Sequence, residues 1–141
     1  MYTVSKTFEF DAGHRLAKGY KGKCAAIHGH RYKVEVIFKS DKLDRYDMLL
    51  DFNIMSYIQN WIDENLDHKF LVYVNDPLLE MLKQFSSVEE SVGEIYICND
   101  NPTAEFIAKL ISSIAKKKFD QVYKVVVWET PKCKAEYIPE G

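Results

Sequence analysis

The chain has 141 residues, of which 47% are hydrophobic and 28% are charged, and its formal net charge is -2. This balance is typical of a folded globular protein and excludes a disordered chain. We expect residues 1–141 to form a single domain, because the composition shows no break along the chain. A negative net charge offers no general attraction to a phosphate backbone, so nucleic acid is not an expected partner.

The sequence also favours a reducing compartment. Residues 1–6 lack the apolar core of a signal peptide, and no apolar stretch is long enough for a membrane helix. Cys24, Cys98 and Cys133 form no C-x-x-C pair and are expected to remain reduced thiols. We therefore expect a cytoplasmic protein without a membrane partner.

Alternating apolar and polar residues predict two strands, over 2–10 and 31–39. They flank a connection at 12–29 that is rich in Gly and Lys. Near the C-terminus, residues 123–129 and 133–138 predict two more strands.

Helical spacing predicts a first helix that is capped by Asp51 and ends near Leu66. A second helix is predicted from Pro102 to about Lys118. Between them, the role of residues 72–101 is open: part of this segment fits a short helix at 77–85, and part fits a strand or extended segment at 94–98.

The order of two strands, two helices and two strands favours an α+β fold. We expect a four-stranded antiparallel sheet (ββααββ) with both helices on one face. Because such a sheet has exposed edges, we also expect a homo-oligomer in which subunits join at these edges.

Three of the four histidines predict a metal site. His28 and His30 project from the same face of a strand, and Gly29 leaves space between them. His14, at the end of the neighbouring strand, completes the set. Three imidazoles with an open fourth position are typical of catalytic zinc. For His28-Gly29-His30 alone, the alternative is a turn whose histidines bond to the backbone.

Cys24 is a candidate general base or nucleophile. It lies four residues before His28, beside Lys21 and Lys23, which favour a thiolate. The alternatives are a small core residue or a fourth zinc ligand. A connection rich in Gly and Lys is an unfavourable place for a core residue, whereas Cys98 has an ordinary setting, as does Cys133.

Asp67 and His68 form a candidate proton shuttle, because an adjacent carboxylate can orient and stabilise an imidazole near neutral pH. The alternative is a histidine that interacts with the negative end of the helix dipole.

Glu129 ends an apolar strand, where a carboxylate needs donors such as the paired N–H groups of a flat ligand. The alternative is a solvated strand end. Thr103 and Glu105 most simply form a helix N-terminus, and contact with a ligand is the less favoured alternative.

Several motifs occur in an order that resembles the family of 6-pyruvoyl- and 6-carboxytetrahydropterin synthases. The motifs are Phe10-x-Ala12-x-His14-Arg15-Leu16, Cys24-x3-His28-Gly29-His30, Asp51-Phe52, Leu66-Asp67-His68, Pro102-Thr103-x-Glu105 and Trp128-Glu129-Thr130.

The resemblance implies the tunnelling fold, in which subunits form a trimeric barrel and two trimers stack into a homohexamer. It implies Zn²⁺ on the three histidines, Cys24 as catalytic base, and Asp67 with His68 as proton relay. It also implies that Glu129 binds the pterin ring, and we count Thr103 and Glu105 of the shared motif as further substrate-binding candidates.

The three-residue gap between Cys24 and His28 is similar to that of the 6-carboxytetrahydropterin synthases. The implied reaction converts 7,8-dihydroneopterin triphosphate to 6-carboxy-5,6,7,8-tetrahydropterin, with release of acetaldehyde and triphosphate, on the route to queuosine-type deazapurines. Two alternatives stay open: a 6-pyruvoyltetrahydropterin synthase acting on the same substrate, and a non-catalytic binding module stabilised by zinc.

Overall fold

The computed structural model describes residues 1–86 and 93–140. Within these residues, six strands form one mixed sheet in the order β4-β3-β1-β2-β5-β6. The strands are β1 (Tyr2–His14), β2 (His28–Ser40), β3 (Lys69–Tyr73), β4 (Glu94–Cys98), β5 (Val122–Thr130) and β6 (Cys133–Tyr137).

Three α-helices accompany the sheet in the described part of the chain. They are α1 (Ser56–Asn65), α2 (Leu79–Ser86) and α3 (Ala104–Lys116). Two short 3-10 turns, η1 (Lys23–Ala25) and η2 (Phe52–Met55), precede β2 and α1 respectively. No helix among residues 1–86 and 93–140 is long and apolar enough to cross a membrane.

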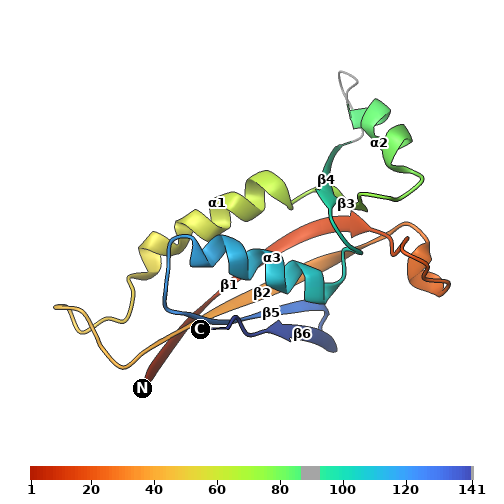
Figure 1. Cartoon of the computed structure of the whole chain (residues 1–141). Helices are drawn as coiled ribbons and strands as arrows, with labels where there is room; N and C mark the ends of the chain where they lie inside the picture. Colours follow the sequence, from red (N-terminus) through yellow and green to blue (C-terminus); the bar gives the residue numbers. More distant parts are fainter. Residues whose placement is uncertain (87–92, 141) are drawn as a thin grey trace.

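The core lies between the sheet and the pair α1 and α3, which cover the same face (Figure 1). Strands β1 and β2 turn alternate side chains toward these helices, including the buried residues Phe8, Phe10 and Val34. Helix α3 contributes Ile107 and Ile111, four residues apart on one face and both fully buried. Each such side chain contributes roughly 1.5–3 kcal/mol to stability.

Side-chain caps mark the starts of η2 and α3. Asp51 Oδ1 accepts a hydrogen bond from the Asn53 amide at 2.9 Å and so caps the 3-10 turn η2, whereas the predicted cap of α1 itself is absent because its first turn follows Met55. Thr103 Oγ1 accepts the Phe106 amide at 3.1 Å and caps α3. These bonds satisfy amides that have no partner within a helix.

The prediction of a four-stranded sheet with two helices was wrong in the number of strands and helices. The four antiparallel strands are present as β1, β2, β5 and β6, but β3 and β4 extend the sheet beyond β1. Strand β3 runs parallel to both of its neighbours, and the extra helix α2 connects it to β4. The suggested short helix at 77–85 and extended segment at 94–98 correspond to α2 and β4.

Strand β3 escaped prediction because its sequence does not alternate. Leu71 and Val72 follow one another and are both buried, with 1% and 0% of their surface exposed. Successive side chains of a strand point to opposite faces, so β3 is covered on both sides. A short continuous apolar run of this kind cannot be told from a buried helical segment by periodicity alone.

Candidate active site

Three histidines converge where β1 and β2 reach the end of the helix-covered face. The register pairs His14 with His28 and Ala12 with His30, so that all three rings share that face. One ligand nitrogen from each ring lies within 4.8 Å of the other two, and the Nε2 atoms of His14 and His28 are 3.0 Å apart. The predicted set is therefore assembled within one chain.

Gly29 acts on the opposite face from the one we expected. A Cβ atom at this position would lie 3.2 Å from the carbonyl oxygen of Ala12. The glycine thus permits close pairing of β1 and β2, and the space between the two flanking histidines comes from strand geometry alone.

Backbone carbonyls fix which nitrogens face the centre of this cluster. His14 Nδ1 donates to the carbonyl of Pro102 at 2.6 Å, and His28 Nδ1 donates to the carbonyl of Ala26 at 2.8 Å. Because a carbonyl only accepts, each Nδ1 carries the proton and each Nε2 keeps its lone pair. Metal-binding histidines in proteins are oriented in this way.

Burial favours the neutral form of His14 and His30. His14 is only 1% exposed, and desolvation lowers its pKa to about 4, despite the hydrogen bond to Pro102 and with a further lowering by His28 and His30. Desolvation also lowers the pKa of His30. The neutral imidazole is the form that binds metal, so at neutral pH little proton competition is expected.

The donor set fits a catalytic metal. Among the described residues, no cysteine or carboxylate places a ligand atom within 4.8 Å of all three nitrogens. The nearby hydroxyl of Tyr32 lies 3.2 Å from His14 Nδ1, and burial raises the pKa of this tyrosine, so it stays protonated. The chain therefore supplies three nitrogen donors, the number typical of catalytic zinc sites with a free coordination position.

Cys24 is close to the histidine cluster in the sequence, but its sulfur is not part of the cluster. The residue is half-buried in η1, within the connection from β1 to β2, and its thiol is free. Its carbonyl accepts the Leu16 amide at 2.8 Å, which closes the base of the connection. Its sulfur does not join the three nitrogens, so the geometry does not favour Cys24 as a fourth ligand.

Asp67 and His68 lie on the turn between α1 and β3. Together with Asp11 of β1, they form a second group of polar side chains. Asp67 Oδ2 lies 2.9 Å from His68 Nδ1, which is the contact that the sequence predicts. Burial alone would raise the pKa of Asp67, but the Asp11 amide at 3.0 Å, the imidazole and the charge of Arg31 together lower it. The carboxylate is thus ionised and holds a ring that is 77% exposed.

The backbone of His68 is strained. Its φ is +60°, a value uncommon for residues other than glycine, and its amide donates to the Asp11 carbonyl at 2.7 Å. This bond ties the turn to β1 and presents the imidazole outward.

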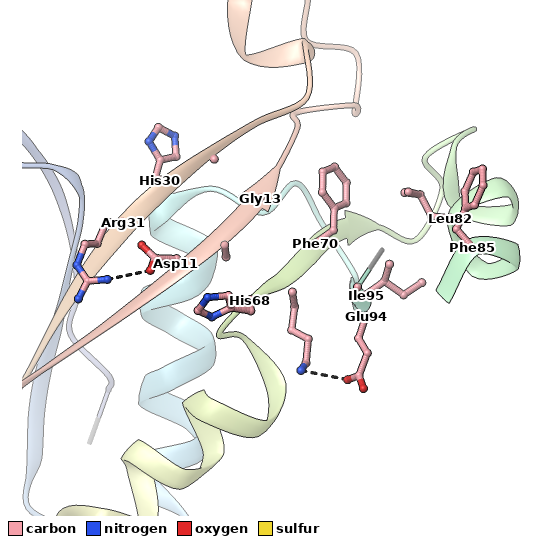
Figure 2. A pocket seen from close by; sticks show the side chains of 14 residues that line it. Asp11, Gly13, His30, Arg31, His68, Phe70, Leu82, Phe85, Glu94 and Ile95 are labelled. Carbon is pink, nitrogen blue, oxygen red and sulfur yellow. Dashed lines mark hydrogen bonds and ion pairs between the residues drawn. The ribbon is translucent and has the colours of Figure 1, made fainter. Parts of the chain in front are cut away.

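A cavity of about 600 Å³ opens beside this second group (Figure 2). Polar side chains lie at one side, where Arg31 donates to Asp11 at 2.8 Å, and apolar side chains of β3 and α2 lie at the other. The lining includes His30, His68, Lys69, Phe70, Leu82 and Phe85. The cavity therefore reaches from His68 to His30, one residue of the histidine cluster.

Glu129 lies near the end of β5, two residues after Val127, which pairs with Val34 of β2. The pairing of β5 with β6 shifts its register between Trp128 and Thr130, at the position of Glu129. The negative charge of Glu129 acts on His30, where it opposes the lowering of the pKa by desolvation. The predicted ligand-binding carboxylate thus lies near the histidine cluster.

The remaining candidates lie at the start of α3. Thr103 uses its side-chain oxygen as the helix cap, and Glu105 is exposed in the first turn. Pro102, just before them, is a contact that sequence reasoning missed, because the site uses only its carbonyl. Tyr32 was also missed, although it follows His30 by two residues and so shares its face.

Fold and site together define an α+β protein in which three histidines at one end of the sheet form a group that could hold a metal ion. A sequence model of the family described as 6-pyruvoyl tetrahydropterin synthase matches residues 3–140. The chain belongs to this family of enzymes.

Individual relatives agree with this assignment. The 6-carboxy-5,6,7,8-tetrahydropterin synthase of Aquifex aeolicus is 37% identical, with 99% of each chain covered. The protein of the same name from Rickettsia felis is 38% identical over 96% of this chain and 99% of its own.

Solved structures show the same fold. An uncharacterized protein of Wolinella succinogenes superposes with a TM-score of 0.86 at 26% identity, covering 99% of this chain and 98% of its own. The 6-pyruvoyl tetrahydropterin synthase of Caenorhabditis elegans superposes with a TM-score of 0.72 at 21% identity, covering 99% and 96%.

Proposed function

We propose that this chain is a zinc-dependent lyase that converts 7,8-dihydroneopterin triphosphate to 6-carboxy-5,6,7,8-tetrahydropterin, with release of acetaldehyde and triphosphate. The observation that carries the proposal is the convergence of three imidazoles, to which no cysteine or carboxylate among the described residues adds a fourth donor. The names of the relatives that cover nearly the whole chain support the carboxy product. We place the reaction in the cytoplasm, on a route to queuosine-type deazapurines.

His14, His28 and His30 would hold the zinc. When bound, the ion supplies a Lewis acid that acidifies the C–H bonds beside the side-chain hydroxyls of the substrate. Cys24 would remove the proton as general base, and His68, held by Asp67, would return one as general acid. The 2.9 Å contact between Asp67 and His68 supports this relay.

Glu129 would orient the substrate. Its carboxylate can accept two hydrogen bonds, one from the ring amide and one from the 2-amino group of the pterin. Its place near the histidine cluster supports this role. Thr103 and Glu105 are proposed as further substrate contacts, because the start of α3 lies next to the Pro102 carbonyl that holds His14.

We further propose a homohexamer built as a dimer of trimers. Strands β4 and β6 form the two edges of the sheet and leave ladder groups without partners in the described chain. Ile97 on β4 and Ile138 just after β6 are 42% and 54% exposed, which supports association at both edges.

Product identification by mass spectrometry tests the reaction. Zinc-loaded protein is incubated with dihydroneopterin triphosphate, and we expect 6-carboxytetrahydropterin together with acetaldehyde. A pyruvoyl product without acetaldehyde would favour the 6-pyruvoyltetrahydropterin synthase alternative. Absence of turnover by fully zinc-loaded protein would favour the non-catalytic module.

A further inference from the structure

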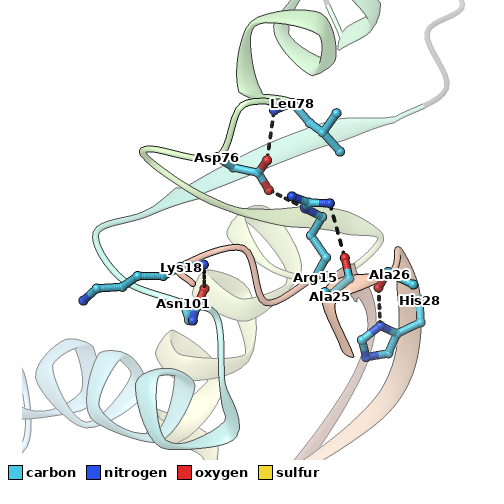
Figure 3. A network of polar contacts seen from close by, with 8 residues as sticks. All are labelled: Arg15, Lys18, Ala25, Ala26, His28, Asp76, Leu78 and Asn101. Carbon is cyan, nitrogen blue, oxygen red and sulfur yellow. Dashed lines mark hydrogen bonds and ion pairs between the residues drawn. The ribbon is translucent and has the colours of Figure 1, made fainter. Parts of the chain in front are cut away.

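A partly buried ion pair joins the connection that carries Cys24 to the turn before α2 (Figure 3). Arg15 Nε donates to Asp76 Oδ2 at 2.9 Å, and the side chain of Asp76 is fully buried. The same guanidinium donates through Nη1 to the carbonyl of Ala25 at 3.2 Å. Arg15 therefore bridges Asp76 and the residue that follows Cys24.

Asp76 is itself held in place by the backbone. Its Oδ1 accepts the Leu78 amide at 2.9 Å, and its own amide donates to the Tyr73 carbonyl at 2.9 Å. A buried carboxylate is costly unless it is paired and hydrogen-bonded, and here both oxygens have donors. The anchor is thus fixed by hydrogen bonds, and it lies on the turn between β3 and α2.

The bridge completes a series of three consecutive bonds around Cys24. The carbonyl of Cys24 accepts the Leu16 amide at 2.8 Å, and the carbonyl of Ala25 accepts Arg15. The carbonyl of Ala26 accepts Nδ1 of His28 at 2.8 Å. The segment that carries the thiol therefore shares one hydrogen-bonded frame with a proposed metal ligand.

A second tether of the same connection is weaker. Lys18 contacts Asp100 and Asn101, but both partners of its ion pair are more than half exposed. Exposed pairs contribute little to stability because water and salt screen them. Arg15 and Asp76, in contrast, supply a partly buried contact with the fixed geometry of a guanidinium fork.

We propose that Arg15, anchored by Asp76, is a positioning residue that fixes the Cys24 segment relative to the histidine cluster. The two bonds of Arg15 need nitrogens in a planar fork, so lysine cannot replace it. The catalytic consequence rests on the proposed role of Cys24, whereas the structural consequence does not.

Two variants test the proposal, Arg15→Lys and Asp76→Asn. For both we expect a kcat lowered about 10- to 100-fold with KM changed less than threefold, because misplacement by about 1 Å can cost that much in rate. We also expect iodoacetamide to modify Cys24 at least threefold faster, since the frame around it is loosened. Trypsin releases Cys24 in the peptide 24–31, which allows its modification to be followed by mass spectrometry.

The controls separate positioning from general damage. Cys133 is exposed and far from the bridge in sequence, so its modification rate in the same samples should not change. Arg45→Gln and Asp63→Asn alter exposed side chains and should leave both readouts at wild-type values. Zinc content is measured for every variant and should stay near one per chain.

Three results would overturn the inference. The first is an unchanged modification rate of Cys24 in Arg15→Lys and Asp76→Asn. The second is faster modification of Cys133 by the same factor, which would indicate general unfolding. The third is a loss of zinc in proportion to the loss of activity. If the wild-type chain does not turn over the pterin substrate, the proposed function fails, yet the modification rate still decides the positioning role.

Discussion

A single carbonyl decides how His14 meets its neighbours. The carbonyl of Pro102, which is 88 residues away in the sequence, accepts a hydrogen bond from Nδ1 of His14. Only Nε2 of the ring then remains as a free acceptor. The spacing of His28 and His30 predicts that their rings share a face, because strand side chains alternate. It cannot predict the tautomer, because that depends on a backbone atom of another element.

The metal site should depend on each of its three donors. In His28→Ala, we expect loss of both bound zinc and activity, because two imidazoles remain and no cysteine or carboxylate among residues 1–86 and 93–140 joins them. Metal content by plasma mass spectrometry and a product assay provide the measurements. A variant that remained active without metal would show the ligand assignment to be wrong.

Cys24→Ala should separate metal binding from chemistry. We expect zinc to remain near one per chain, because the sulfur lies outside the group of three nitrogens, and we expect turnover to be abolished. The same metal and product assays apply. Loss of zinc in this variant would instead make Cys24 a ligand of a closed site.

Cys98 provides a test of burial at the same scale. Desolvation raises the pKa of its thiol to about 12. At pH 8 only about one thiol in ten thousand would be ionised, and the thiolate is the reactive form. Iodoacetamide should therefore leave Cys98 unmodified in the native protein, with the exposed Cys133 as the reactive reference. Equal modification of both would contradict the packing of β4.

At the scale of elements, sequence reasoning worked where a periodic pattern was long. Helix α3 lies close to its predicted bounds because it presents one continuous apolar face. Strand β5 does so because its run of Val and aromatic residues has a high β propensity over nine residues. It failed for β3, a five-residue strand covered on both faces. Since β3 and β4 are parallel neighbours joined through a helix, their pairing has no local signal of the kind that a hairpin turn gives.

The start of α3 is predicted to contribute measurably to stability. Thr103→Ala removes the acceptor for the Phe106 amide, and we expect the free energy of unfolding to fall by about 1 kcal/mol. Urea denaturation followed by circular dichroism measures the change. Ser113→Ala in the same helix is a matched control, because this exposed hydroxyl bonds only to the Leu110 carbonyl of its own helix. Equal losses in both variants would argue against a capping role.

At the scale of the whole molecule, the two candidate groups lie in different settings. The histidine cluster shares a face with the core, whereas Asp67 and His68 lie beside an open cavity. Short motifs in the sequence predicted the three histidines and the pair of Asp67 and His68, but not that Asp11 lies with this pair. Their relative placement could not be predicted, because it depends on β3, the strand that periodicity did not reveal.

The proposed assembly gives a prediction for mass. Sedimentation or light scattering should yield six times the chain mass of 16.4 kDa, since association would cover the ladder groups of β4 and β6. A single-chain mass that persists at micromolar concentration would contradict the homohexamer.

The long reach of the bond between His14 and Pro102 has a consequence for biosynthesis. A nascent chain presents all three ligand histidines once residue 30 has emerged from the ribosome, but the acceptor that orients His14 is made 72 residues after His30. The His14 ring can therefore take its final orientation only after the start of α3 has been translated and has docked. Uptake of the proposed zinc ion at the complete three-histidine geometry would follow that step.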